Sequence, residues 1–319
     1  MSIQGCNDDG SVPWVDESRT RVSEECHYLC GTSTGLVPGY RSGHLGLKYR
    51  VSRLINSNYY PAMLKIYGVP NSQPVRAVVW PCLMRALPFE LVLTSQNRDA
   101  KTPAYMSAVN PRGTIPAIDD DGIVLWESHA ILIYLCEKHG WRDLWPEDLA
   151  HRARVNQYLH FHHRNTRELV IQWSRTLWPS VFGIADPDPA WLRRNTFPGL
   201  QNNASVVTQT LEIIDAMLAQ SDYIAGAGGL TLADIVAYEE LGQNQAAYAN
   251  CTDYAPYPNI GAWLTRMATL PAHDEAHEIW RQIGDVNRIE GGVSTIVAAN
   301  KLAAGVWREA VAKMQLKIG

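Results

Sequence analysis

The sequence predicts an α/β domain followed by an all-helical domain, with an extension on either side. The first observation is a series of short strand and helix patterns between residues 63 and 140. The second is that residues 147–285 contain only helical periodicities, with apolar side chains three or four positions apart. The third is the length of 319 residues, which is enough for two domains of ordinary size.

The α/β domain begins with a strand, a helix and a second strand. Residues 63–68 end in glycine and favour a short strand, and residues 69–74 form a polar turn with helix-capping side chains. Apolar residues from Val75 to Leu87 then recur at helical spacing, although Pro81 predicts a kink or an early end. Residues 89–94 alternate again, and a strand–helix–strand unit implies that the two strands are parallel.

Two further strands and a helix complete this domain. Residues 116–118 and 123–126 are β-prone, and the Asp-Gly step between them is a strong hairpin signal. A helix is expected from Ser128 to about Lys138. With a short helix before the hairpin, the order of elements is a thioredoxin-like layout. We expect this domain to span residues 63–140.

The second domain is expected to be entirely helical and to span residues 147–285. A capping-box pattern begins at Thr231, with Asp234 in place of the usual glutamate. The helical periodicities cover residues 148–169, 205–220, 231–241, 259–270 and 272–283.

The two ends of the chain are interpreted as extensions. Residues 1–60 hold no sustained apolar period, so we expect an irregular N-terminal segment. Residues 290–319 form a C-terminal extension, in which residues 293–318 have the pattern of an amphipathic helix.

Composition excludes several classes of function. The 28 basic and 32 acidic residues give a net charge of −4, and no basic run is present, which argues against nucleic-acid binding. The apolar runs are far shorter than the roughly 20 residues that cross a membrane, and the acidic N-terminus does not resemble a targeting segment. Six scattered cysteines favour reduced thiols, so we expect a cytoplasmic protein without membrane association.

Ser72 stands where the first helix begins. A free thiol has a pKa of about 8.5 and is mostly protonated at neutral pH. A hydroxyl that donates a hydrogen bond to a thiolate, with a helix N-terminus behind it, stabilises the ionised form. Ser72 is therefore a candidate for activating a thiol, and the alternative is a plain helix cap.

Two other positions suit a peptide-like ligand. Pro116 opens a strand after Ile115, which fits a sheet edge or a cis bond in a tight turn. Such a turn leaves the backbone of Ile115 free to pair with a peptide as an extra strand, unless the turn is purely structural. Glu127 and Ser128 enter a helix, where a carboxylate beside a small anion site can hold both charged groups of an α-amino acid, although a Ser cap is the simpler alternative.

Three segments together resemble the glutathione transferases. They lie in the same order as the three candidate positions above and cover residues 72–78 (SQPVRAV), 110–118 (NPRGTIPAI) and 127–135 (ESHAILIYL). The Ser-Gln-Pro step and residues 161–167 and 274–279 are similar to the theta class, especially to its plant members. The resemblance covers about residues 63 to 283.

This resemblance implies roles for individual residues. Ser72 would orient the sulfur of glutathione, and Ile115 would pair with its cysteinyl backbone ahead of a cis Pro116. Glu127 and Ser128 would hold its γ-glutamyl end.

The resemblance also implies charged and polar contacts around the site. Arg167 would oppose a developing anion, with a surface salt bridge as the alternative role. Thr114 stands where many theta enzymes have a basic residue. Lys101 is expected to supply a polar glutathione contact, with Arg98 or Arg112 as alternatives.

The function that the resemblance implies is an enzymatic one, with glutathione as co-substrate and no metal. The glutathione thiolate would attack a hydrophobic electrophile such as a halide, an epoxide or a hydroperoxide, in detoxification. We expect a homodimer in the cytoplasm. Peroxidase, isomerase and dehalogenase activities on this scaffold stay open, and the alternative from another class is a non-catalytic interaction or scaffold protein.

Overall fold

The computed structural model describes residues 63–170, 204–289 and 292–318. The expected N-terminal extension over residues 1–60 lies outside the described residues. It includes Cys26 and Cys30, a pair that could bind metal or be redox-active but that no second cysteine pair accompanies in the sequence. From the sequence, Trp173, Trp178 and Phe182 are candidates for lining a hydrophobic substrate cleft, with a place in the core as the simpler alternative, and all three lie outside the described residues.

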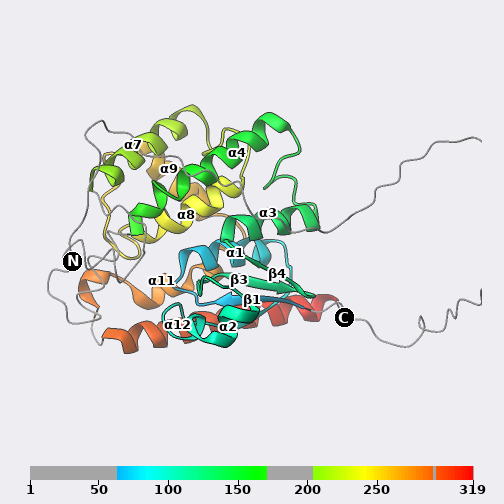
Figure 1. Cartoon of the computed structure of the whole chain (residues 1–319). Coiled ribbons are helices and arrows are strands. Elements are labelled where there is room, and N and C mark those ends of the chain that lie inside the picture. Colours follow the sequence, from blue (N-terminus) through cyan, green and yellow to red (C-terminus); the bar gives the residue numbers. More distant parts are fainter. Residues whose placement is uncertain (1–62, 171–203, 290–291, 319) are drawn as a thin grey trace, which may run out of the picture. The chain divides into compact units, whose positions relative to one another are not determined.

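A four-stranded mixed sheet forms the N-terminal part of the described chain (Figure 1). The strands lie in the order β2-β1-β3-β4. β1 (Leu64–Gly68) is parallel to β2 (Phe89–Leu93) and antiparallel to β3 (Ala117–Asp120), which pairs in turn with β4 (Ile123–Trp126). The predicted strand–helix–strand unit and the predicted hairpin are both confirmed.

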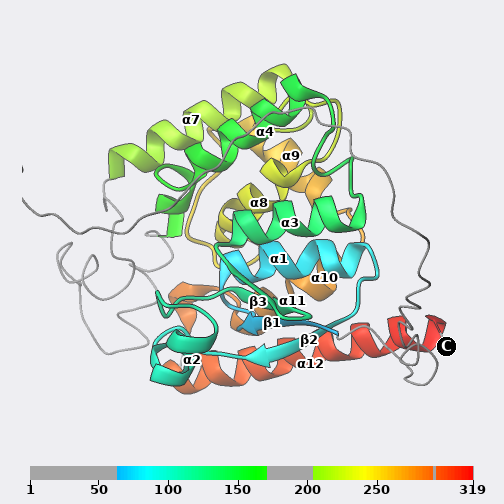
Figure 2. The same ribbon diagram turned by 45° about the vertical axis from the view of Figure 1, so that its right-hand side comes forward.

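Helices lie on both sides of this sheet. α1 (Gln73–Met84) and α3 (Ser128–His139) lie on one side, and α2 (Pro103–Ala108) lies on the other, after the short 3-10 helix η1 (Asp99–Lys101) (Figures 1 and 2). α1 ends three residues after Pro81, whose ring nitrogen has no hydrogen to donate. This confirms the thioredoxin-like layout.

The helical part that follows confirms three of the predicted helices with small shifts at their ends. α8 begins with the predicted capping box, in which Asp234 accepts the backbone N–H of Thr231 at 3.0 Å. The three helices are α7 (Ala204–Gln220), α8 (Leu232–Asn244) and α9 (Pro258–Met267).

Two predicted helices are interrupted. The helix expected over residues 148–169 ends as α4 (Leu149–His162), where the Asn165 amide donates to the Phe161 carbonyl at 2.9 Å in place of a helical N–H, and the 3-10 helix η2 (Thr166–Leu169) follows.

The helix expected over residues 272–283 is likewise two short helices, α10 (His273–Ala276) and α11 (Glu278–Ile283), followed by the 3-10 helix η3 (Val286–Arg288). The break falls at His277, whose ring Nδ1 lies 2.7 Å from the carbonyl oxygen of His273.

The long C-terminal helix α12 (Gly292–Ile318) packs against α10, α11 and the edge strand β2 (Figure 2). Its buried surface includes the small side chains of Ala303 and Ala304 and the indole of Trp307. The indole Nε1 of Trp307 donates to the Glu275 carbonyl at 2.9 Å. These contacts confirm the predicted helix and hold it beside the sheet.

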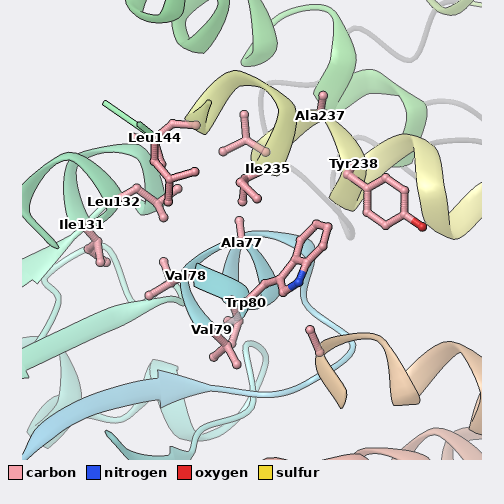
Figure 3. Packing of buried hydrophobic residues seen from close by; sticks show 14 of the residues in the cluster. Ala77, Val78, Val79, Trp80, Ile131, Leu132, Leu144, Ile235, Ala237 and Tyr238 are labelled. Carbon is pink, nitrogen blue, oxygen red and sulfur yellow. The ribbon is translucent and has the colours of Figure 1, made fainter. Parts of the chain in front are cut away.

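One core joins the sheet-bearing part to the helical part (Figure 3). Ala77 and Trp80 on α1 are fully buried towards α8, where Ile235 and Tyr238 meet them. The Trp80 and Tyr238 rings lie 5.3 Å apart between centroids. Because α1 is packed on both the sheet and α8, the residues at its N-terminus have a fixed position relative to the helical part.

Candidate active site

A pocket of about 590 Å³ opens at the N-terminus of α1. Its wall is built by six separate segments, which are the loop before α1, the loop after β2, the turn before β3, the start of α3, the end of α4 with η2, and the first turns of α12. Seven of the eight residues that the sequence analysis proposed for catalysis and ligand binding line it, namely Ser72, Thr114, Ile115, Pro116, Glu127, Ser128 and Arg167.

Ser72 occupies the N-cap position of α1 with an extended backbone, at φ −83° and ψ 118°. Its side chain makes no capping hydrogen bond, and it lines the pocket instead. The first turn of α1 contains no acidic residue, so the positive end of the helix dipole is not neutralised by a side chain there. The hydroxyl of Ser72 is thus placed where it can donate to an anion in the pocket.

The loop that carries Ser72 is held from two sides. On one side, the guanidinium of Arg76 on α1 donates to the Pro70 carbonyl at 2.9 Å and pairs with Glu239 of α8 at 2.7 Å. From α12, the Oδ1 atom of Asn300 accepts the backbone N–H of Asn71 at 2.9 Å. The contact of Arg76 with Pro70 spans six positions, whereas the contacts with Glu239 and Asn300 join residues more than 160 positions apart.

Pro116 follows a cis peptide bond from Ile115, at the start of β3. The backbone N–H of Ile115 donates to the Gln96 Oε1 atom at 3.1 Å, so it is not free in the way that the sequence analysis expected. The Thr114 carbonyl accepts from the hydroxyl of Tyr105 at 2.8 Å. Gln96 is therefore a pocket residue that the sequence analysis missed.

Glu127 and Ser128 lie at the start of α3. Glu127 has a φ of 71°, an uncommon conformation for a residue with a side chain, and such residues cluster at functional sites. Its carboxylate is exposed, whereas Ser128 is half-buried as the first residue of the helix. Both side chains line the pocket, beside the N–H groups at the helix N-terminus.

The basic residues separate into two groups. Lys101 does not line the pocket, because its Nζ atom donates to the Gly113 carbonyl at 2.6 Å. Arg98 and Arg112 do line it. Arg98 pairs with Asp99 at 3.0 Å, and the Ser95 N–H together with Arg98 lowers the pKa of Asp99 to about 2. Arg112 is exposed at the pocket wall.

Arg167 lies in η2 and pairs with Glu240 of α8. The Glu240 side chain is 1% exposed and that of Arg167 is 16% exposed, so this is an internal ion pair and not a surface one. Burial raises the pKa of Glu240, and the attraction of Arg167 opposes that rise. The pair places a guanidinium at the inner wall of the pocket.

Three histidines form a polar cluster on the same wall. His129 of α3 lies between His162 and His163 at the end of α4, with ring centroids 5.2 and 4.5 Å away. Burial and the neighbouring His163 lower the pKa of His129 to about 3, and burial places the pKa of His162 well below its usual range. These rings are therefore neutral at pH 7. Within the described segments, no group of three or more side chains is arranged to hold a metal ion.

The sequence analysis did not assign this cluster, because His129 lies on another helix more than thirty positions before His162 and His163. It also gave no role to α12, whose apolar side chains Val293, Ile296 and Val297 form part of the pocket wall. Their spacing of three and four residues places them on one face of the helix.

Comparison with known proteins identifies the architecture. The model for the glutathione S-transferase N-terminal domain matches residues 66–143, and that for the C-terminal domain matches residues 199–271. Human glutathione S-transferase T1-1 in its apo form superposes with a TM-score of 0.60 at 28% identity, over 76% of this chain and 98% of that one. A thioredoxin-like sheet domain followed by helices, with a pocket at the start of α1, is thus the architecture of a glutathione-dependent transferase.

Sequence relatives define the class. Mouse glutathione S-transferase theta-1 is 30% identical over 229 residues, which are 70% of this chain and 91% of the relative. Rat glutathione S-transferase theta-2 is 35% identical over 220 residues, or 67% and 85% of the two chains. The chain belongs to the glutathione S-transferase family, in its theta class. None of the helices in the described ranges has the length and apolar character needed to cross a membrane.

Proposed function

We propose that this transferase joins the sulfur of glutathione to a hydrophobic electrophile, and that the Ser72 hydroxyl stabilises the thiolate. The observation that supports this most strongly is the placement of Ser72. Its hydroxyl lies at a helix N-terminus, makes no capping hydrogen bond and lines the pocket that also holds Ile115, Glu127 and Ser128.

The chemistry requires the thiol to lose its proton. A hydroxyl donor and the N-terminus of α1 both favour the charged form, so they lower the pKa of a thiol that otherwise lies near 8.5. The thiolate then forms a carbon–sulfur bond. An alkyl halide loses its halide ion with the bonding electrons, whereas an epoxide opens and its oxygen takes up a proton. Arg167 would oppose negative charge that develops during this step.

Recognition of glutathione is assigned to the other side of the pocket. Glu127 would pair with the γ-glutamyl ammonium, while Ser128 and the start of α3 would hold the adjacent carboxylate. Pairing of the cysteinyl backbone with Ile115 requires the Gln96 side chain to move from the N–H that it now accepts. Arg112 is better placed than Lys101 for the second carboxylate, because Lys101 is engaged with Gly113. Thr114 would contribute to the same wall.

The electrophile is assigned to the apolar side, next to Val293, Ile296 and Val297 of α12. Halides and epoxides with apolar groups suit this wall, and so do organic hydroperoxides. A hydroperoxide would be reduced and not conjugated: its O–O bond breaks to give an alcohol, and two glutathione molecules are oxidised to the disulfide with release of water. Detoxification is the role that we propose. We further propose the domain limits 63–140 and 147–285, a cytoplasmic location and a homodimer. The exposed Ile123 and Val124 on the edge strand β4 support an interface between subunits, which light scattering would detect.

The decisive experiment follows glutathione binding by titration calorimetry and thiolate formation by ultraviolet absorbance. Ser72→Ala should lower the conjugation rate at neutral pH by about 100-fold, the scale seen when one donor to a developing anion is removed, while the fold stays intact. Ser107→Ala, on an exposed face of α2, is the matched control.

Two results would contradict the proposal. Parent-like conjugation by Ser72→Ala would show that another group ionises the thiol. A parent protein that binds no glutathione in a saturable way would instead favour the non-catalytic interaction protein that shares this fold.

A further inference from the structure

The hydrogen bond between α12 and the loop before α1 connects residues 229 positions apart. Asn300 accepts the Asn71 N–H through Oδ1 at 2.9 Å, while its Nδ2 donates to the Ile296 carbonyl at 2.9 Å. The second bond fixes the orientation of the amide group, because Nδ2 faces the Ile296 carbonyl and Oδ1 is thereby left on the side of Asn71. Asn300 is thus a fixed acceptor and not a freely rotating surface side chain.

The atoms that Asn300 and Arg76 hold belong to the same peptide unit. Arg76 donates to the carbonyl of Pro70, and Asn300 accepts from the N–H of Asn71, which is the other end of that peptide plane. The next residue in the chain is Ser72, whose own N–H closes the turn to the Val69 carbonyl at 3.1 Å. Rotation of the held peptide plane would change the direction in which the Ser72 side chain leaves the backbone.

The same part of α12 also forms the pocket wall. Asn300 follows Ile296 and Val297 by four and three residues, so the three side chains lie on one face of the helix. Further along, Trp307 anchors α12 to the Glu275 carbonyl at 2.9 Å. The part of α12 that contacts the Ser72 loop is therefore itself held in place. α12 lies beyond both segments that match the family models, because the second of them ends at residue 271.

We propose that Asn300 is a positioning residue, which holds the peptide unit before Ser72 so that the Ser72 hydroxyl points at the glutathione sulfur. This inference rests on the proposed function of Ser72. It follows that α12 affects the ionisation of the thiol through the loop, in addition to forming the apolar wall. Loss of the Asn300 acceptor should leave glutathione bound but less ionised.

The test compares Asn300→Leu with the parent, with Ser72→Ala and with the double variant. The readout is the pKa of the bound thiol, measured from thiolate absorbance against pH, together with glutathione affinity. Asn300→Leu should raise that pKa by about half to one unit, which is about three- to tenfold less thiolate at pH values below it. The conjugation rate should recover at high pH. Glutathione affinity, measured at a pH below the pKa of the bound thiol in both proteins, should change less than twofold.

The double variant separates a positioning role from a structural one. If Asn300 acts through Ser72, its substitution should cause no further shift of the thiol pKa once the hydroxyl is absent. Leu302→Ala, an exposed position two residues along α12, is the control and should match the parent. A further shift in the double variant, or the same shift in the control, would overturn the inference.

Hydrogen exchange at the Asn71 amide gives an independent measurement on the unaltered protein. The amide should be protected in the parent and in Ser72→Ala, and it should exchange rapidly in Asn300→Leu. Rapid exchange in the parent would overturn the inference even if the variant does not fold. The two proposals can fail separately. If the thiol pKa rises in Ser72→Ala but stays at the parent value in Asn300→Leu, the role of Asn300 is overturned and the proposed function of Ser72 stands. If the thiol pKa in Ser72→Ala equals that of the parent, the proposed function of Ser72 is itself overturned.

Discussion

At the scale of single residues, Glu127 combines a left-handed backbone with an exposed carboxylate at the pocket wall. Its backbone carbonyl accepts the Ile131 N–H at 3.0 Å, so the backbone of Glu127 is part of the first turn of α3. Its side chain makes no capping hydrogen bond and lines the pocket. A carboxylate in this position is suited to an ammonium group, and the γ-glutamyl end of glutathione carries one.

We expect Glu127→Gln to weaken glutathione binding by about 10- to 150-fold, because one charge-assisted hydrogen bond contributes about 1.5–3 kcal/mol. Titration calorimetry measures the effect, and Glu90→Gln on an exposed position of β2 is the control. A glutathione analogue without the α-amino group should bind the parent and Glu127→Gln equally. A difference that persists with this analogue would assign Glu127 to another part of the ligand.

His129 makes a separate contribution at the residue scale. Its pKa falls from an ordinary value of 6.5 to about 3 in the folded protein, mainly through burial. Between these two pH values the unfolded chain takes up a proton that the folded protein excludes, so stability is lost as the pH falls below 6.5. At pH 5 this loss is about 2 kcal/mol for one residue.

We therefore expect His129→Phe to lose about 2 kcal/mol less stability than the parent between pH 7.5 and pH 5. Urea unfolding at the two pH values measures this difference. His151→Phe, at a half-buried position of α4 whose side chain is 42% exposed, should leave the parent's difference unchanged. Equal losses in the parent and in His129→Phe would mean that this imidazole is protonated inside the fold.

At the scale of elements, β1 and α1 approach each other closely at Gly68. A Cβ atom on this glycine would lie 2.4 Å from one methyl carbon of Val75 and 2.8 Å from the other. Val75 is fully buried and branched at Cβ, so it has little room to turn away. The glycine that closes β1 therefore sets the distance between the strand and the helix that begins beside Ser72.

Gly68→Ala should lower the free energy of unfolding by about 1–3 kcal/mol, which is the usual cost of overpacking. The double variant Gly68→Ala/Val75→Ala should recover part of this loss, because the clash is removed. Gly261→Ala on α9 has open space around its Cβ and should be neutral or stabilising. Thermal unfolding compares all three, and equal stability of Gly68→Ala and the parent would contradict the close packing.

The elements also show how far sequence patterns reach. The four strands, α1, α3 and α12 follow from local periodicity, and Ser72 and Glu127 follow from their places at the start of helices. The Gln96 contact with Ile115 spans 19 positions, and the Asn300 contact with Asn71 spans 229. Such contacts leave no local period, because they depend on how finished elements pack. The sequence analysis missed two helix breaks for the same reason. At Asn165 the side-chain amide takes the place of a helical N–H donor, and at His277 the ring contacts the carbonyl of His273.

At the scale of the whole molecule, a buried ionic network joins α1 to the helical part. The Arg76 guanidinium, which is completely buried, bonds the Glu239 carboxylate at 2.7 Å and Gln243 at 3.1 Å. His277 contacts the other oxygen of Glu239 at 3.1 Å, and the ring of Trp280 lies 4.2 Å from the guanidinium carbon. Burial opposes ionisation of Glu239, but His277 and Arg76 keep its pKa below the ordinary value.

Removal of one partner should cost more than removal of both. Arg76→Met leaves the Glu239 carboxylate without its guanidinium, so we expect a loss of about 3–5 kcal/mol. Arg76→Met/Glu239→Met should be more stable than Arg76→Met alone, because no uncompensated carboxylate then remains. Urea unfolding measures both. A double variant less stable than the single one would show that the contact with His277 stabilises the Glu239 carboxylate by more than its burial without Arg76 costs.

The ribosome adds Asn71 to the chain long before Asn300. Protein synthesis proceeds at about 5–20 residues per second, so the 229 positions between them correspond to about 10–45 s of translation. Once Trp126 has been made, the nascent chain contains all four strands and Ser72, yet the Asn71 N–H still has no partner from α12 and the apolar wall does not exist. The pocket is therefore completed only when nearly all of the described residues have been made, and a chain that stalls before Asn300 would present the Ser72 loop without the finished wall of the pocket.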